Sequence, residues 1–87
     1  YLVYEYLPAG AEYAEMGFFE FDAHNGTIGA FLDAPFYAYN LEPGYYIELW
    51  DGTIKGHKLP PGLYVLAVYA EYKGLSTIKA GLFEIKR

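Results

Sequence analysis

The sequence contains no cysteine, and only six of its 87 residues are Lys or Arg. Without cysteine, no disulfide reinforces so small a domain and no Cys/His set is available to bind zinc. The formal net charge of −5 lacks the basic footprint that phosphate groups require, so we expect no nucleic-acid partner. The same charge disfavours an anionic membrane surface.

Long apolar runs are also missing. The longest weakly polar stretches, Ala34–Tyr39 and Leu63–Ala70, are far shorter than the ~20 residues of a membrane helix, which predicts no membrane insertion. The chain starts at Tyr1 with neither a Met nor a signal peptide, and we interpret this start as a processed or engineered terminus. Processing would suit export, so the expected location is extracellular or at the cell surface.

Residue types with catalytic chemistry are sparse. His24 and His57 are the two histidines, Ser76 is the one serine, and all three lie next to predicted turns, which disfavours a Ser-His-Asp set. Most of the eleven carboxylates alternate with apolar residues, as solvent-facing strand positions do. Asp22, Asn25 and Asp33 offer oxygen ligands near one turn, but calcium loops usually supply more carboxylates. We predict a protein that is not an enzyme and binds no cofactor and no metal.

Aromatic residues are what the chain has in excess. They make up 21% of it, with eleven Tyr and six Phe. A domain of this size buries only about 60–65% of its unfolded surface, so some of these rings must be exposed. Exposed apolar patches usually mark an interface.

Alternating patterns and turn residues predict strands throughout. We expect hairpins at Asn25-Gly26, at Asp51-Gly52 and at Gly74 within Lys73-Gly74-Leu75. The first would pair Phe19 with Leu32, and the second would pair Leu49 with Ile54. A three-residue loop at the third would place Val68 on the same face as Ile78, Ala80 and Leu82, with a bulge at Gly81.

A short phrase recurs before three of the predicted strands: Leu7-Pro8-Ala9-Gly10, Leu41-Glu42-Pro43-Gly44 and Pro60-Pro61-Gly62-Leu63. Pro43-Gly44 and Pro61-Gly62 fit type II turns, which splay hairpin strands and therefore suit corners between sheets. Residues 1–87 are thus predicted to form a single all-β domain, an antiparallel two-sheet sandwich of about seven short strands.

The stretch LPPGLYVLAVYAEY, from Leu59 to Tyr72, resembles the strand-entry phrase of fibronectin type III, carboxypeptidase-regulatory-like and other immunoglobulin- or prealbumin-like modules. The resemblance implies an immunoglobulin-like sandwich in which the hydroxyl of Tyr64 braces the corner. It also implies a binding, spacer or assembly role outside the cytoplasm, by analogy of fold.

Function is expected to lie in contacts of the aromatic surface. The N-terminal strand is apolar on both faces, with Leu2, Tyr4 and Tyr6 on one and Val3 and Leu7 on the other. We expect it to be donated to a neighbouring subunit; the alternative is that it closes its own domain. We predict a non-enzymatic, self-assembling subunit of a filament or surface layer; a monomeric carbohydrate- or protein-binding module and a designed β-protein without a natural ligand are the alternatives. The candidate interface residues are Leu2, Tyr4, Tyr6, Tyr37, Tyr39, Tyr46 and Trp50.

Asn25-Gly26-Thr27 is also an acceptor sequon for N-glycosylation, placed at a predicted hairpin tip. Asn25 is therefore a candidate modification site.

Overall fold

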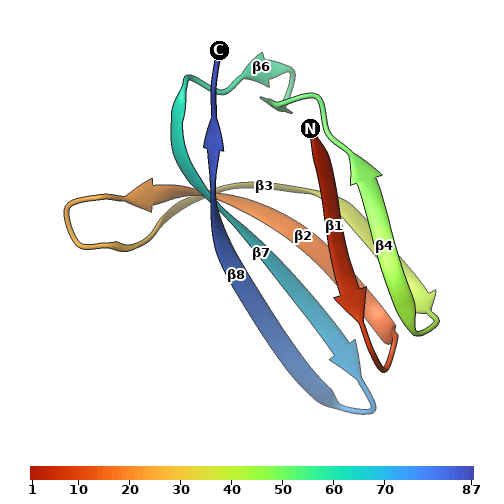
Figure 1. Ribbon diagram of the computed structural model, residues 1–87. Helices are drawn as coiled ribbons and strands as arrows, with labels where there is room; N and C mark the ends of the chain where they lie inside the picture. Colours follow the sequence, from red (N-terminus) through yellow and green to blue (C-terminus); the bar gives the residue numbers. More distant parts are fainter.

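The computed structural model describes residues 1–87, which form eight β-strands and no helix (Figure 1). The strands are β1 (Leu2–Leu7), β2 (Ala11–Asp22), β3 (Thr27–Leu41), β4 (Gly44–Leu49), β5 (Thr53–Ile54), β6 (His57–Lys58), β7 (Gly62–Tyr72) and β8 (Leu75–Ile85). The prediction of an all-β chain is confirmed. The structure contains no helix with the length and apolar character needed to cross a membrane.

The strands form three antiparallel sheets. The largest has four strands in the order β3-β2-β7-β8, whereas β1 pairs with β4 and the short β5 pairs with β6. In Figure 1, β1 and β4 run next to each other, separate from the four larger strands. The four strands of the largest sheet are not short as predicted: β2 has 12 residues, β3 has 15, and β7 and β8 have 11 each.

The core lies between the β1–β4 sheet and one face of the four-stranded sheet. Val3 from β1 belongs to the same buried cluster as Met16, Phe18 and Val68 of the larger sheet. Leu7 packs in a second cluster with small residues of β2 and β7, namely Ala11, Ala14 and Ala70. We call the side of each sheet that faces this core its inner face and the opposite side its outer face.

The repeated phrase marks places where the chain passes from one sheet to another, as predicted. Residues 7–10 link β1 to β2, residues 41–44 link β3 to β4, and residues 60–63 link β6 to β7. The turn type is different from the prediction. Gly44 and Gly62 have φ values of 148° and 152°, far from the roughly +80° of a type II turn. This region of φ is open essentially only to glycine.

A tyrosine braces each of two corners. The hydroxyl of Tyr64 donates a hydrogen bond of 2.6 Å to the carbonyl oxygen of Pro60, which confirms the contact expected for this residue. The hydroxyl of Tyr46 donates in the same way to the carbonyl oxygen of Glu42. The echoed sequence phrases therefore build the same local contact twice.

The first hairpin has the predicted turn residues but a different register. Gly26 donates a backbone hydrogen bond of 2.7 Å to Asp22, and the strands meet with Phe21 opposite Ile28 and Phe19 opposite Phe31. The predicted pairing of Phe19 with Leu32 is wrong. The loop is longer than two residues because the Asp22 carboxylate accepts hydrogen bonds from the backbone of His24 and Asn25, which extends the turn.

The hairpin predicted at Asp51-Gly52 is absent. Leu49 pairs with Leu2 instead of Ile54, and the turn lies at Lys55-Gly56, whose φ values are 51° and 81°. Positive φ at both positions is the requirement of a type I′ turn. Gly52 instead allows the close approach of Tyr1, because a Cβ at this position would lie 2.8 Å from the Tyr1 ring.

The last hairpin turns on two residues, Lys73 and Gly74, because Tyr72 pairs with Leu75. A shift of one residue moves every side chain of a strand to the other face. Val68 accordingly faces Lys79, whereas Ile78, Ala80 and Leu82 lie on the outer face. The pairing of β7 with β8 is continuous, so the predicted bulge at Gly81 is also wrong.

Candidate interaction surfaces

The outer face of the β1–β4 sheet consists entirely of large apolar and aromatic side chains. Three cross-strand pairs form it: Leu2 with Leu49, Tyr4 with Ile47 and Tyr6 with Tyr45. All six residues are exposed, by 45% to 79%. We call this surface the ribbon face. It has no charged side chain among its paired positions, which is unusual for a strand face in contact with water.

A second apolar surface lies on the outer face of the four-stranded sheet. Its exposed members are Phe31, Tyr37, Tyr39, Ile78 and Leu82, at 58% to 68% exposure. We call this surface the sheet face. The ring of Phe31 contacts that of Phe19 with centroids 5.3 Å apart, and Tyr39 contacts Tyr13 at 5.0 Å. Since the core lies between the two sheets, the ribbon face and the sheet face point in opposite directions.

Gly17 lies at the centre of the sheet face, opposite Ala67 of β7. A Cβ at this position would lie 3.4 Å and 3.6 Å from the rings of Phe19 and Phe31. These rings cover Gly17, which is itself buried, and Ala67 and Ala80 lie opposite it along the same row of the outer face.

The predicted interface residues divide between these surfaces and the interior. Leu2, Tyr4 and Tyr6 lie on the ribbon face, and Tyr37 and Tyr39 on the sheet face. Tyr46 is half-buried and Trp50 is only 4% exposed, so neither belongs to an exposed aromatic platform.

The exposed residues of β4 are Tyr45, Ile47 and Leu49, which alternate with the predicted interface residues Tyr46 and Trp50. They were not identified from the sequence. Their regular spacing was visible in the sequence. Because Tyr46 and Trp50 alternate with them, however, both sides of this strand look apolar.

Two carboxylates on the sheet face hold tyrosine hydroxyls. The hydroxyl of Tyr13 donates a hydrogen bond of 2.8 Å to Glu15, and this bond raises the pKa of Tyr13 to about 12. Tyr69 donates to Glu71 in the same manner, and that hydrogen bond raises the pKa of Tyr69. These carboxylates thus have local partners within the sheet face.

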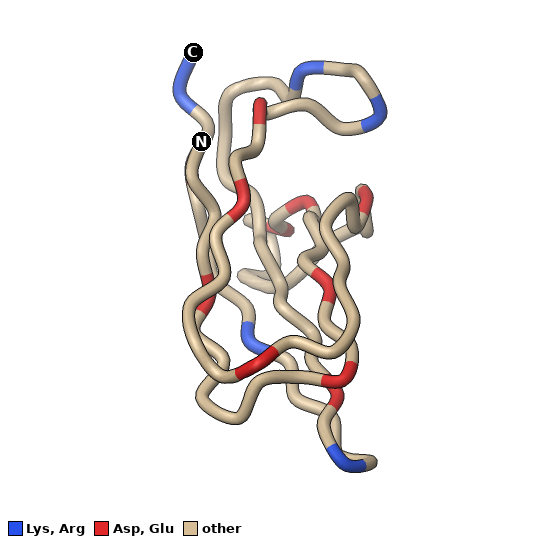
Figure 2. Tube along the Cα trace, turned by 90° about the vertical axis from the view of Figure 1, so that its right-hand side faces the viewer, with Lys and Arg blue, Asp and Glu red and all other residues tan.

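The charged side chains do not gather into a basic patch. Figure 2 shows the acidic residues spread along the chain, with most Lys and Arg residues in the turns and at the C-terminal end. One ion pair is present, between Lys79 and Glu5, at 3.5 Å.

The side chains considered for metal binding or modification lie at the β2–β3 hairpin tip. The Asp22 carboxylate accepts a bond of 2.8 Å from the Asn25 amide, and hydrogen bonds from Asn25 lower the pKa of Asp22. No group of three or more His, Cys, Asp or Glu residues is positioned to hold a metal ion. Asn25 is exposed, and its glycosylation stays a prediction.

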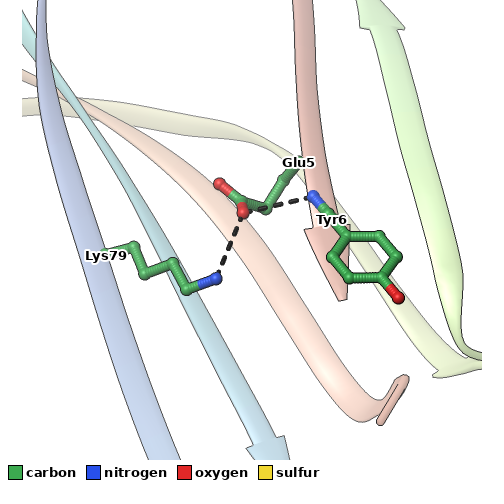
Figure 3. A network of polar contacts seen from close by, with 3 residues as sticks. All are labelled: Glu5, Tyr6 and Lys79. Atoms are coloured by element: carbon green, nitrogen blue, oxygen red, sulfur yellow. Dashed lines mark hydrogen bonds and ion pairs between the residues drawn. The ribbon is translucent and has the colours of Figure 1, made fainter. Parts of the chain in front are cut away.

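A groove of about 420 Å³ opens between β1 and β8. Consecutive residues of both strands line it, and its floor includes Phe18, Leu66 and Val68. Figure 3 shows Glu5 reaching across from β1: its carboxylate pairs with Lys79 and accepts a hydrogen bond of 3.1 Å from the backbone N–H of Tyr6.

No protein-family model matches the chain. The chain is 44% identical over 78 residues to part of the minor extracellular protease Vpr of Bacillus subtilis. The similarity covers 88% of this chain but 9% of that protein, so the chain spans less than a tenth of its relative's length. The likeness therefore concerns one segment of a much larger protein.

Proposed function

We propose that the chain is a non-enzymatic interaction module of an extracellular protein, and that copies associate head to tail, ribbon face against sheet face. The observation that carries the proposal is the ribbon face itself, six large apolar side chains exposed side by side. Isolated exposed apolar residues are common in proteins, whereas a contiguous patch of this kind usually marks a contact surface.

The head-to-tail form is supported by the presence of two different apolar faces on opposite sides. A face that binds its own copy closes a two-fold dimer, whereas a face that binds a different face leaves one of each free. Repetition of such a contact yields a filament unless the rotation closes a ring. The exposed rings of Tyr4 and Tyr45 on one copy would pack against the exposed rings of Phe31, Tyr37 and Tyr39 on the next.

An extracellular setting is supported by the similarity to a segment of an extracellular protease. The same similarity to a natural protein favours a natural over a designed origin. It suits a role as an accessory part of a larger secreted chain, because the similar segment makes up 9% of that protease. Within such a chain, the immunoglobulin-like sandwich remains our proposal for the architecture, supported by the two facing sheets and the Tyr64 corner.

Carbohydrate binding is less well supported. Tyr37 and Tyr39 are exposed, but their ring planes meet at 84° and do not form one flat surface for a sugar. Trp50, the residue best suited to stack on a sugar, is buried.

Two double variants test the proposal. Ile47→Lys with Leu49→Lys places charges on the ribbon face, and Ile78→Lys with Leu82→Lys places them on the sheet face. The four positions are at least 58% exposed, so we expect both variants to fold. Light scattering after size exclusion should show assemblies for the natural chain and monomers for each variant alone.

An equimolar mixture of the two variants is the decisive sample. Each variant retains the face that the other has lost, so the mixture should contain dimers and nothing larger. If the ribbon-face variant alone becomes monomeric while the sheet-face variant forms dimers, association is ribbon to ribbon and the head-to-tail proposal is wrong. A natural chain that stays monomeric at millimolar concentration contradicts self-association altogether.

A further inference from the structure

We propose that the groove between β1 and β8 is a strand-acceptor site, which binds an extended apolar peptide segment as a third strand beside β1. This inference is separate from the proposed self-association, because it uses the free edge of β1 and the inner face of β8 instead of the two outer faces. It rests on unpaired backbone groups, an incompletely covered core and an empty socket at Gly81.

The edge of β1 that faces the groove has unpaired backbone groups. Tyr1 and Trp50 exchange two hydrogen bonds, each 2.8 Å long, between their backbone groups. In an antiparallel pair, residues that exchange bonds with the neighbouring strand alternate with residues that do not. The N–H and C=O groups of Leu2, Tyr4 and Tyr6 therefore point away from β4, toward the groove.

The position of Tyr6 supports this assignment, because its N–H donates to the side chain of Glu5 and not to β4. The Glu5 carboxylate, held also by Lys79, closes this end of the edge (Figure 3). Leu2 and Tyr4 remain open. A peptide that pairs with them would form four backbone hydrogen bonds, the usual source of affinity when a strand is added to a sheet edge.

The floor of the groove is a core that β1 and β4 leave partly uncovered. Leu66 of β7 and Phe83 of β8 pack against the main buried cluster but are only half-buried themselves. A third strand next to β1 would lie over these two residues. Its inward side chains would complete the layer that the two-stranded sheet begins.

Gly81 provides a socket for one of those inward side chains. It lies on the inner face of β8, opposite Leu66, and lines the groove. A Cβ built at Gly81 meets no atom within 4 Å. The sheet thus has empty space above this residue, directly in the path of an added strand.

The geometry favours a lone extended segment as the occupant over a second copy of the chain. Strands β7 and β8 already lie beneath the position of an added strand. If a whole second copy supplied its β1 as the added strand, its four-stranded sheet would lie in the same layer as the four-stranded sheet of this chain. The two sheets would then overlap at β8. The lining is mostly apolar, so the segment should have uncharged, apolar side chains at every second position.

The test is a titration with the peptide acetyl-Ser-Val-Thr-Val-Thr-Val-Ser-amide, followed by amide NMR shifts of the full chain. We expect saturable shifts at Leu2, Tyr4 and Gly81, with weaker binding by at least about tenfold in Gly81→Leu, which fills the socket. Ile78→Phe, which adds bulk on the opposite face of the same strand and outside the groove lining, is the matched control and should bind as the natural chain does. The same measurement in the ribbon-face double variant, whose two substitutions lie outside the groove lining, removes any effect of assembly.

A second peptide of the same sequence, N-methylated at every residue, keeps the side chains but cannot donate hydrogen bonds to an edge. It should not bind. Equal binding of both peptides, or no shift at Leu2, Tyr4 and Gly81 at millimolar peptide, would overturn the proposal. It would also be overturned if Gly81→Leu abolished self-association without affecting peptide binding, because the occupant would then be a second copy.

Discussion

Trp50 stacks on Phe18, with ring centroids 4.2 Å apart and planes inclined by 21°. The indole N–H donates a hydrogen bond of 2.9 Å to the carbonyl oxygen of Thr53. The one polar group of the buried ring therefore has a hydrogen-bond partner. Phe83 meets Trp50 edge-on at 5.8 Å. Trp50, which directly follows β4, therefore anchors the β1–β4 sheet to the larger sheet.

Replacement of Trp50 by Ala should lower the free energy of unfolding by about 3–5 kcal/mol, the usual range for a buried aromatic ring. So large a loss is most of the stability expected for a small domain. Urea denaturation monitored by circular dichroism measures it. Leu49→Ala, at the adjacent exposed position, is the control and should change stability by less than about 0.5 kcal/mol. Equal effects of the two substitutions would contradict the assignment of Trp50 to the core.

Tyr64→Phe removes the hydroxyl that braces the corner before β7. The loss should be about 0.5–1.5 kcal/mol, with a further cost if the Pro60 carbonyl oxygen is left without a partner. Tyr46→Phe removes the equivalent bond to Glu42, which is exposed, and should cost less. Denaturant midpoints of the two variants make the comparison. A larger loss of stability in Tyr46→Phe would show that burial does not determine how much the corner hydrogen bond stabilises the fold.

The pH dependence of Tyr13 follows from its bond to Glu15. The pKa of Tyr13 rises from 10.0 to about 12, so between these values the folded chain keeps a proton that the unfolded chain has lost. The contribution of this bond to stability is therefore complete below about pH 10 and is lost as the pH rises toward 12. Glu15→Gln should lower the pKa of Tyr13, as measured by NMR titration of the tyrosine rings. Glu12→Gln, whose carboxylate bonds the backbone of Lys73, should leave it unchanged.

The sequence predicted the strands and the corners well, because both depend on local chemistry. Gly and Pro mark the passages between sheets, and Tyr64 braces its corner as the resemblance implied. Register was harder to predict. Whether the last hairpin turns on two or three residues decides which face Ile78 and Leu82 occupy, and the residues Lys73-Gly74-Leu75 permit both.

The outer and inner sides of β4 could not be separated from sequence for a related reason. Tyr45, Ile47 and Leu49 alternate with Tyr46, Glu48 and Trp50, so neither set is clearly polar. Only the packing of Trp50 on Phe18, a contact between residues far apart in the chain, decides which set is buried. The same ambiguity holds for β1, because alternation separates Val3 and Leu7 from Leu2, Tyr4 and Tyr6 but does not say which set is buried. The structure buries Val3 and Leu7.

The central claim, that the ribbon face of one copy binds the sheet face of the next, is tested most directly by intermolecular NOE measurements on a mixture of isotope-labelled and unlabelled chains. The two double variants, mixed in equal amounts, supply a complex of fixed size for this measurement. We predict NOEs between Leu2, Tyr4 or Tyr6 of one chain and Phe31, Tyr37 or Tyr39 of the other. Intermolecular NOEs that join ribbon-face residues only to ribbon-face residues, or their absence at millimolar concentration, would contradict the claim.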